Sequence, residues 1–177
     1  MTIGFNHLGR HGRLGNQMFQ YAGLRGIAAH KGYDFAIPPS DFTDEWTDHQ
    51  LFEAFKLVGL TKIEQVPGPY VQEAHFHFDQ NLFDNMPDGH NVYAYLQSTK
   101  YFEHIEEDIR EDFEFKNDIH LPCKEMMDTL ENPIALHVRR GDYIQNCDNH
   151  PPCPKEYYDA ALSKFDNNRT VVVFSDD

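Results

Sequence analysis

The sequence is poor in cysteine, in long apolar runs and in positive charge. Its three cysteines, Cys123, Cys147 and Cys153, form an odd number, and no basic and apolar leader with a cleavage site precedes them. These features predict a reduced, cytoplasmic protein. The longest apolar runs fall far short of the roughly 20 residues that cross a bilayer, so no membrane span is expected.

Basic residues are scarce as well, with 15 Lys and Arg against 29 Asp and Glu and a formal net charge of -14. This balance disfavours nucleic acid or an anionic membrane as the main partner. The first 33 residues are an exception, because they contain Arg10, Arg13, Arg25 and Lys31 but no Asp or Glu. One end of an acidic chain is therefore free of carboxylates, which suggests a site for a small anion.

The strongest candidate site is the segment Ile134–Tyr143. Its apolar beginning predicts a buried strand, which leads directly into Arg139, Arg140, Gly141 and Asp142. Adjacent guanidinium groups repel each other unless an anion lies between or beside them, and each matches phosphate oxygens bidentately. The glycine permits a turn or the close approach of a ligand. An Arg–Asp pair that closes a surface turn would explain the same residues, so both interpretations stay open.

A glycine-rich turn near the N-terminus is the second candidate for an anion site. Thr2–Leu8 is expected to be a strand, glycines follow at positions 9, 12 and 15, and helical spacing begins near Met18. Backbone amides and the N-terminal dipole of a helix attract anions, and Arg13 adds a positive charge. The spacing matches neither the dinucleotide-binding nor the Walker pattern. Such a turn also occurs as an ordinary connection in α/β proteins.

The rest of the chain alternates between predicted strands and helices, which is typical of an α/β fold with parallel sheets. Asn132–Pro133 is the expected boundary between domains at 1–132 and 133–177. Residues 41–60 are expected to begin as a loop that holds the only tryptophan, Trp46, and 62–69 and 82–89 are expected to be irregular. The other strands are predicted at 33–37, 70–79, 91–96, 134–138 and 170–174, and the other helices at 49–57, 100–113, 122–130 and 155–164.

Two groups of residues have side chains that can bind metals: His75, His77 and Asp79, and Cys147, His150 and Cys153. A half-exposed strand with Phe76 and Phe78 facing inward explains the first group and is the preferred explanation. A proline-rich loop explains the second. We therefore predict no metal site, and a metal hydrolase is the least favoured function.

Three motifs resemble a known family. Gly12–Ala22, His137–Tyr143 and Val173–Asp177 occur here in the order found in the α-1,2-fucosyltransferases of glycosyltransferase family 11. Segments of Tyr95–Phe113 and Glu156–Ala161 look similar to the intervening parts of that family. The resemblance therefore extends from the first turn to the last residue.

The resemblance implies a GT-B-like fold, with a Rossmann-like N-terminal half near the acceptor sugar and a second Rossmann-like half that binds GDP-fucose. The implied reaction transfers L-fucose to a galactose hydroxyl of a glycan, with inversion and without a metal or other cofactor. Family members continue beyond the third motif, so the second half is expected to be incomplete. Its exposed faces would favour a homo-oligomer. The alternative function is that of a non-catalytic remnant that binds a nucleotide sugar or a glycan.

The resemblance also implies roles for individual residues. Arg139 and Arg140 would hold the diphosphate and stabilise the charge of the leaving GDP, and Asp142 or His137 would accept the proton of the acceptor hydroxyl. Asp176 is the candidate for the guanine edge, because one carboxylate can accept from two adjacent donors. The implied substrate-binding residues are Gly12, Arg13, Gly15, Asn16, Gln17, Tyr143, Ser175 and Asp176.

Overall fold

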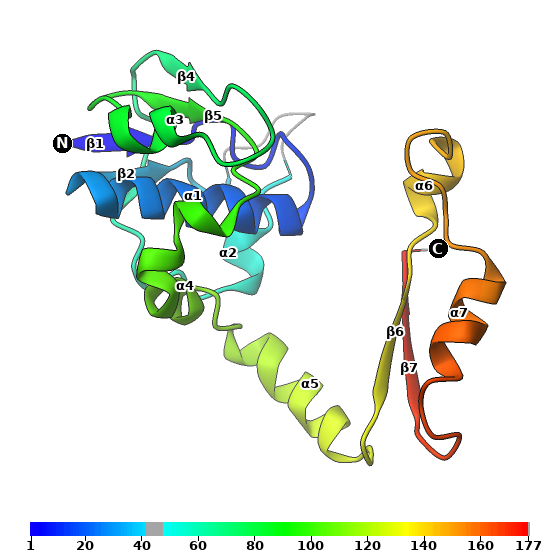
Figure 1. The fold of residues 1–177 in the computed structure, drawn as a ribbon. Coiled ribbons are helices and arrows are strands. Elements are labelled where there is room, and N and C mark those ends of the chain that lie inside the picture. The colour runs from blue at the N-terminus through cyan, green and yellow to red at the C-terminus, as the bar shows by residue number, and fades with distance from the viewer. Residues whose placement is uncertain (42–47, 177) are drawn as a thin grey trace. The chain divides into compact units, whose positions relative to one another are not determined.

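Two α/β units, Met1–Ile119 and His120–Asp177, each contain a parallel sheet (Figure 1). The division between them falls inside a helix. The boundary expected from the sequence, after Asn132, lies beyond the end of that helix.

The computed structural model describes residues 1–41 and 48–176. Trp46, in the predicted loop, and Asp177, at the end of the third motif, lie outside these ranges. Within the described ranges, no helix is long and apolar enough to span a bilayer.

The sheet of the first unit has five strands in the order β3-β2-β1-β5-β4. Every pairing between neighbouring strands is parallel, which confirms the predicted parallel sheet. The chain enters β2 on one side of β1 and later returns to β5 on the other side, so the strand order reverses between β1 and β5. The strands are β1 (Thr2–Gly4), β2 (Asp34–Ile37), β3 (Lys62–Ile63), β4 (Tyr70–Gln72) and β5 (Asn91–Tyr93).

Three of these strands, β1, β4 and β5, are shorter than the sequence predicts, and β3 lies in a segment that was expected to be irregular. β1 ends at Gly4, and the amide of Leu8 donates to the carbonyl of Phe5 to close a turn. β4 ends at Gln72, and the chain then bends instead of continuing as a strand to Asp79. The Asp79 carboxylate accepts from the amides of Ala74 and Leu82, at 3.1 and 3.0 Å, and these bonds fix the bend.

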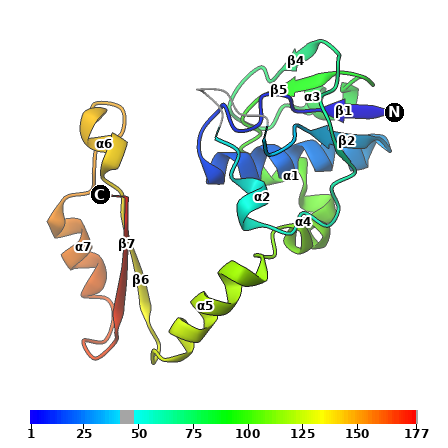
Figure 2. The same cartoon turned by 180° about the vertical axis from the view of Figure 1, so that it is seen from behind.

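Helix α1, Leu14–Lys31, runs along the sheet (Figures 1 and 2). It begins four residues before the predicted start, and Gly32 ends it in the left-handed conformation with φ 68°. Two glycines on its buried side permit close packing. A Cβ on Gly23 would lie 2.7 Å from the Leu96 side chain, and one on Gly26 would lie 1.9 Å from the Tyr101 carbonyl oxygen.

The shorter helices of the first unit differ most from the prediction. The side chain of Asp79 caps a helix at 80–85 that the sequence prediction treats as a loop. The helix predicted at 100–113 is interrupted at Phe102, whose φ of -139° is not helical. Nearby, the buried Tyr101 hydroxyl accepts from the Asp79 amide and donates to Glu73. The observed elements are α2 (Leu51–Ala54), α3 (Gln80–Asn85), η1 (Thr99–Tyr101), η2 (Glu103–Ile105) and α4 (Glu106–Asp112).

A buried carboxylate joins α1 to α4 in the first unit. Asp112 is fully buried and accepts from the Tyr21 hydroxyl at 2.7 Å, from the Gly59 amide at 2.6 Å and from the Arg25 guanidinium. Burial and the bond to Asp112 raise the pKa of Tyr21. Because a buried charge requires a partner and satisfied hydrogen bonds, these contacts fix the position of α4 against α1.

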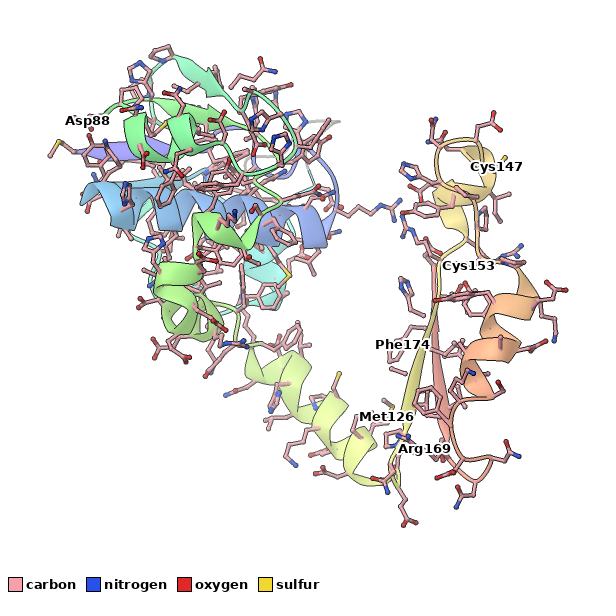
Figure 3. The ribbon with its side chains drawn as sticks, viewed as in Figure 1. Asp88, Met126, Cys147, Cys153, Arg169 and Phe174 are labelled. Carbon is pink, nitrogen blue, oxygen red and sulfur yellow. The ribbon has the colours of Figure 1, made fainter. Side chains whose placement is uncertain are left out.

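The second unit contains a two-stranded sheet in which β6 pairs parallel with β7. Arg169 fixes the loop that leads into β7, since its guanidinium donates to the carbonyls of Asn132 and Pro133 at 2.6 and 3.1 Å (Figure 3). The bounds of β6 agree with the prediction, but the strand is not buried as expected, since only Ile134 is buried. The loop expected after it contains a short helix. The elements are α5 (Asn117–Asp128), β6 (Ile134–Val138), α6 (Gly141–Gln145), α7 (Lys155–Leu162) and β7 (Val171–Ser175).

Asp112→Ala is expected to lower the free energy of unfolding by about 3 kcal/mol or more, because it leaves the Arg25 guanidinium and the Tyr21 hydroxyl without their buried partner. Urea unfolding followed by circular dichroism measures the change. Arg110→Ala removes an exposed partner of Glu106 on the same helix and is the matched control. A midpoint for Asp112→Ala equal to that of the control would contradict this role.

Candidate functional site

The parallel pairing of β6 and β7 brings two of the sequence motifs together. Val138, the last residue of β6, is in register with Ser175, the last residue of β7. Parallel strands end at the same edge of a sheet, so Arg139 and Asp176, which follow these residues, meet there. The Ser175 hydroxyl donates to the Val138 carbonyl at 3.0 Å and so holds the two strand ends together.

Both oxygens of Asp176 contact the turn after β6. Oδ1 accepts from the Arg140 amide at 2.9 Å, and Oδ2 lies 2.6 Å from Nη1 of Arg139. The bond from the Arg140 amide, followed by the charge of Arg139, lowers the pKa of Asp176. A Cβ on Gly141 would lie 2.6 Å from Oδ2, so glycine is required for this close approach. The predicted contact with a guanine edge would compete with these bonds, and the geometry makes Asp176 the residue that fixes the turn.

Arg139 is held by two carboxylates and one aromatic ring. Its Nη2 lies 2.5 Å from Oδ1 of Asp142, while its Nη1 contacts Asp176. The guanidinium carbon lies 5.0 Å from the centre of the Tyr143 ring, which in turn stacks on His150 at 4.8 Å. The Arg–Asp pair suggested by the sequence is therefore present. It orients a guanidinium at the sheet edge where parallel α/β proteins bind their ligands.

The other predicted residues of this motif occupy different positions. Arg140 precedes α6, and its side chain is exposed. His137 is exposed on β6, opposite Phe174 of β7. Of the two residues considered as a proton acceptor, Asp142 is therefore bound to Arg139, whereas His137 lies on the strand that precedes the turn.

In the first unit, the glycine-rich turn has an internal structure that the sequence did not reveal. Gly12 has φ 87°, and a Cβ there would collide with the Asn16 side chain. Gln17 is fully buried, with its amide group donating to the Asp48 carbonyl at 2.6 Å and accepting from the Gln50 amide at 3.0 Å. Gln17 thus has a structural role in the first unit.

The start of α1 is held by side chains from other segments. The Leu14 amide donates to Gln50 at 3.0 Å, and Asn16 accepts from Gln97 at 2.6 Å. Arg13 and Gly15 are exposed, and nothing lies within 4 Å of the position of a Cβ on Gly15. Of the predicted binding residues in this turn, Gly12, Arg13 and Gly15 are exposed, and Gly12 lies against the Asn16 side chain.

The predicted strand with His75 and His77 on one face is wrong. The segment bends, and the two imidazole rings stack at 3.6 Å. Phe76 was expected to face inward but is 74% exposed. Among the residues that the structure describes, no group of three His, Cys, Asp or Glu side chains is arranged to hold a metal ion.

Comparison with known proteins gives the family. The model of the family described as glycosyl transferase family 11 matches residues 2–177. The chain belongs to glycosyl transferase family 11. A curated relative, the O-antigen biosynthesis glycosyltransferase WbnK of Escherichia coli, is 29% identical over 122 residues, which cover 61% of this chain and 40% of WbnK. The chain thus matches about two-fifths of the length of this relative.

Solved structures support the GT-B-like α/β fold. The fucosyltransferase NodZ from Bradyrhizobium is 15% identical with a TM-score of 0.57, and the match covers 99% of this chain and 72% of NodZ. NodZ α-1,6-fucosyltransferase co-crystallised with GDP is 13% identical with a TM-score of 0.54, over 98% and 70% of the two chains. At these identities the likeness establishes the fold of this family 11 chain.

The carboxylate of Asp176 is expected to titrate below the ordinary range for aspartate. Its contribution to stability is therefore fully present above the ordinary pKa and is lost as the pH falls through the lowered pKa of the folded state. Arg139→Ala should raise this pKa without restoring the ordinary value, because the Arg140 amide still donates. Carboxyl ¹³C NMR measures the titration, with Lys164→Ala as the control. An unchanged titration in Arg139→Ala would contradict the ion pair.

Proposed function

We propose that this chain provides the donor-diphosphate site of an inverting α-1,2-fucosyltransferase, which transfers L-fucose from GDP-fucose to a galactose hydroxyl of a glycan. The observation that carries the proposal is the Arg139 guanidinium, which Asp142 and Asp176 hold at the carboxyl edge of β6 and β7. The family supports it, as do solved relatives described as fucosyltransferases, one of them soaked with GDP-fucose. The three sequence motifs support the α-1,2 linkage.

In this reaction the acceptor oxygen attacks C1 of fucose as the bond from C1 to the β-phosphate oxygen breaks. The electron pair of that bond remains on GDP, and the acceptor hydroxyl loses its proton to a base. Negative charge therefore grows on the β-phosphate. A guanidinium held in place beforehand stabilises this charge without having to reorganise during the reaction.

Arg139 suits this role because a guanidinium has five N–H donors. Two carboxylate contacts orient it and leave other N–H groups to bind phosphate oxygens. Arg140 adds a second positive charge at the same turn. Asp176 and Asp142 act as positioning residues for Arg139, and His137 becomes the preferred candidate for the proton acceptor.

The turn with Arg13 and Gly15 is a second candidate anion site, within the first unit. Both residues are exposed at the start of α1, where the helix dipole favours negative charge. Gln17 and Gln50 hold the start of α1 through two hydrogen bonds. The turn is therefore a positively charged, exposed surface of the first unit.

Arg139→Ala is expected to lower the rate of transfer at saturating GDP-fucose by at least about 100-fold, because it removes a preorganised cation from the leaving group. Transfer of radiolabelled fucose to lactose measures the rate, and circular dichroism checks that the fold is retained. Lys164→Ala removes a cation from the segment after α7 and is the matched control. Full turnover in Arg139→Ala would defeat the assignment.

Two further measurements separate the alternatives. Calorimetric binding of GDP without any transfer would support the non-catalytic remnant. Linkage analysis of the product should show fucose at O2 of galactose. A product linked through O6 would contradict the α-1,2 proposal and agree with the linkage named for the solved relative.

A further inference from the structure

The first unit contains a pocket of about 270 Å³ that the donor site does not use. It lies at the carboxyl ends of β4 and β5 and is also lined by the segment that follows β1. Open parallel sheets bind ligands outside the carboxyl ends of their strands where the strand order reverses, and here that point lies between β1 and β5. Its principal lining residues are His11, Gln72, Glu73, Phe76, Tyr93 and Tyr95.

Aromatic rings from three separate segments form one wall of this pocket. His11 lies 4.7 Å from Tyr93, edge to face, and 5.9 Å from Tyr95. Tyr95 is also 5.7 Å from Phe76. Phe76 is 74% exposed, so its ring is open to a ligand.

The polar groups in the pocket favour a neutral ligand over an anionic one. Among the described residues that line it, none is Lys or Arg, and Glu73 brings a carboxylate. Glu73 is engaged by the fold, since Oε2 accepts from the amides of Tyr95 and Leu96 at 3.1 and 3.2 Å, and Oε1 accepts from the Tyr101 hydroxyl. Glu73 therefore positions the backbone of Tyr95. The pocket offers aromatic faces, the imidazoles of His11 and His75, and the Gln72 amide.

This chemistry suits a single pyranose ring. The C–H groups on one face of a hexose pack on aromatic rings, while its hydroxyls require donors and acceptors at the edge. Burial, and secondarily the charge of Arg10, lowers the pKa of His11, so at neutral pH its imidazole is neutral and can accept a hydrogen bond. The volume is below the range of pockets for drug-sized ligands, which favours one sugar residue over a longer chain.

We propose that this pocket binds the terminal hexose of the acceptor glycan, with the sugar ring against Tyr95 and Phe76 and its hydroxyls toward His11 and Gln72. The identity of the hexose as galactose rests on the proposed function. The proposal that the pocket binds a sugar ring rests on the aromatic rings that line it and on the contacts of Glu73 with the backbone of Tyr95. His11 immediately precedes the Gly12–Gln17 turn, so the sugar subsite adjoins this turn within the first unit.

The test is saturation-transfer NMR of the whole chain with methyl β-D-galactopyranoside. Tyr95→Ala and Phe76→Ala should each weaken binding about fivefold, the effect of one stacked ring. Tyr95→Phe should retain binding. The backbone of residue 95 stays tethered to Glu73 in these variants, so the fold should persist. Tyr157→Ala, an exposed tyrosine on α7, is the matched control.

The experiments distinguish an error in the sugar-pocket proposal from an error in the proposed function. GDP binding that persists while galactoside binding is absent, or is unaffected by Tyr95→Ala and Phe76→Ala, overturns the pocket and leaves the donor site intact. Displacement of the galactoside by guanosine also overturns it. Galactoside binding that depends on Tyr95, without fucose transfer, supports the pocket and counts against the enzyme. In an active enzyme, Tyr95→Ala should raise KM for the acceptor and leave KM for GDP-fucose unchanged.

Discussion

Parallel strand pairing is the constraint on which both proposed sites depend. It places the carboxyl ends of neighbouring strands at one edge of the sheet. Backbone pairing alone is therefore enough to bring residues that are distant in sequence close together. In the second unit it joins Arg139 to Asp176 across 36 intervening residues. In the first unit it gathers the segments that follow β1, β4 and β5 around one pocket. Loss of register in either sheet would separate these residues even if every helix remained.

The four charged residues at the sheet edge of the second unit act together. Arg139 and Arg140 are positive, while Asp142 and Asp176 are negative, so the group is formally neutral without a ligand. A diphosphate would bind the N–H groups of Arg139 that the two carboxylates leave open, and it would make the group anionic. Asp142 has the more exposed side chain of the two carboxylates, and Asp176 is fixed by the Arg140 amide. Asp176 is consequently the better-fixed of the two contacts that orient the guanidinium.

The sequence predicted those elements whose signal is local. The continuous apolar run of β6 lies between Pro133 and the arginines, and its bounds were predicted correctly. Helix α3 was missed because its start depends on Asp79, which the prediction assigned to a strand. The sequence also could not distinguish binding from structure in the glycine-rich turn. Gln17 belongs to the same motif as Arg13, yet only its burial against residues 48–50 shows that it supports the fold.

The aromatic pocket shows why such a site escapes a reading of the sequence. His11, Phe76, Tyr93 and Tyr95 belong to three segments, and no pattern within one segment indicates that their rings meet. The only sequence signal is that each residue lies at or after the end of a predicted or observed strand. The strand predicted at 70–79 also implied, wrongly, that Phe76 faces the core. The bend after Gln72 reverses that assignment and brings the ring beside Tyr95. Because Glu73 bonds to the backbone of Tyr95, the bend that exposes Phe76 also positions the ring beside it.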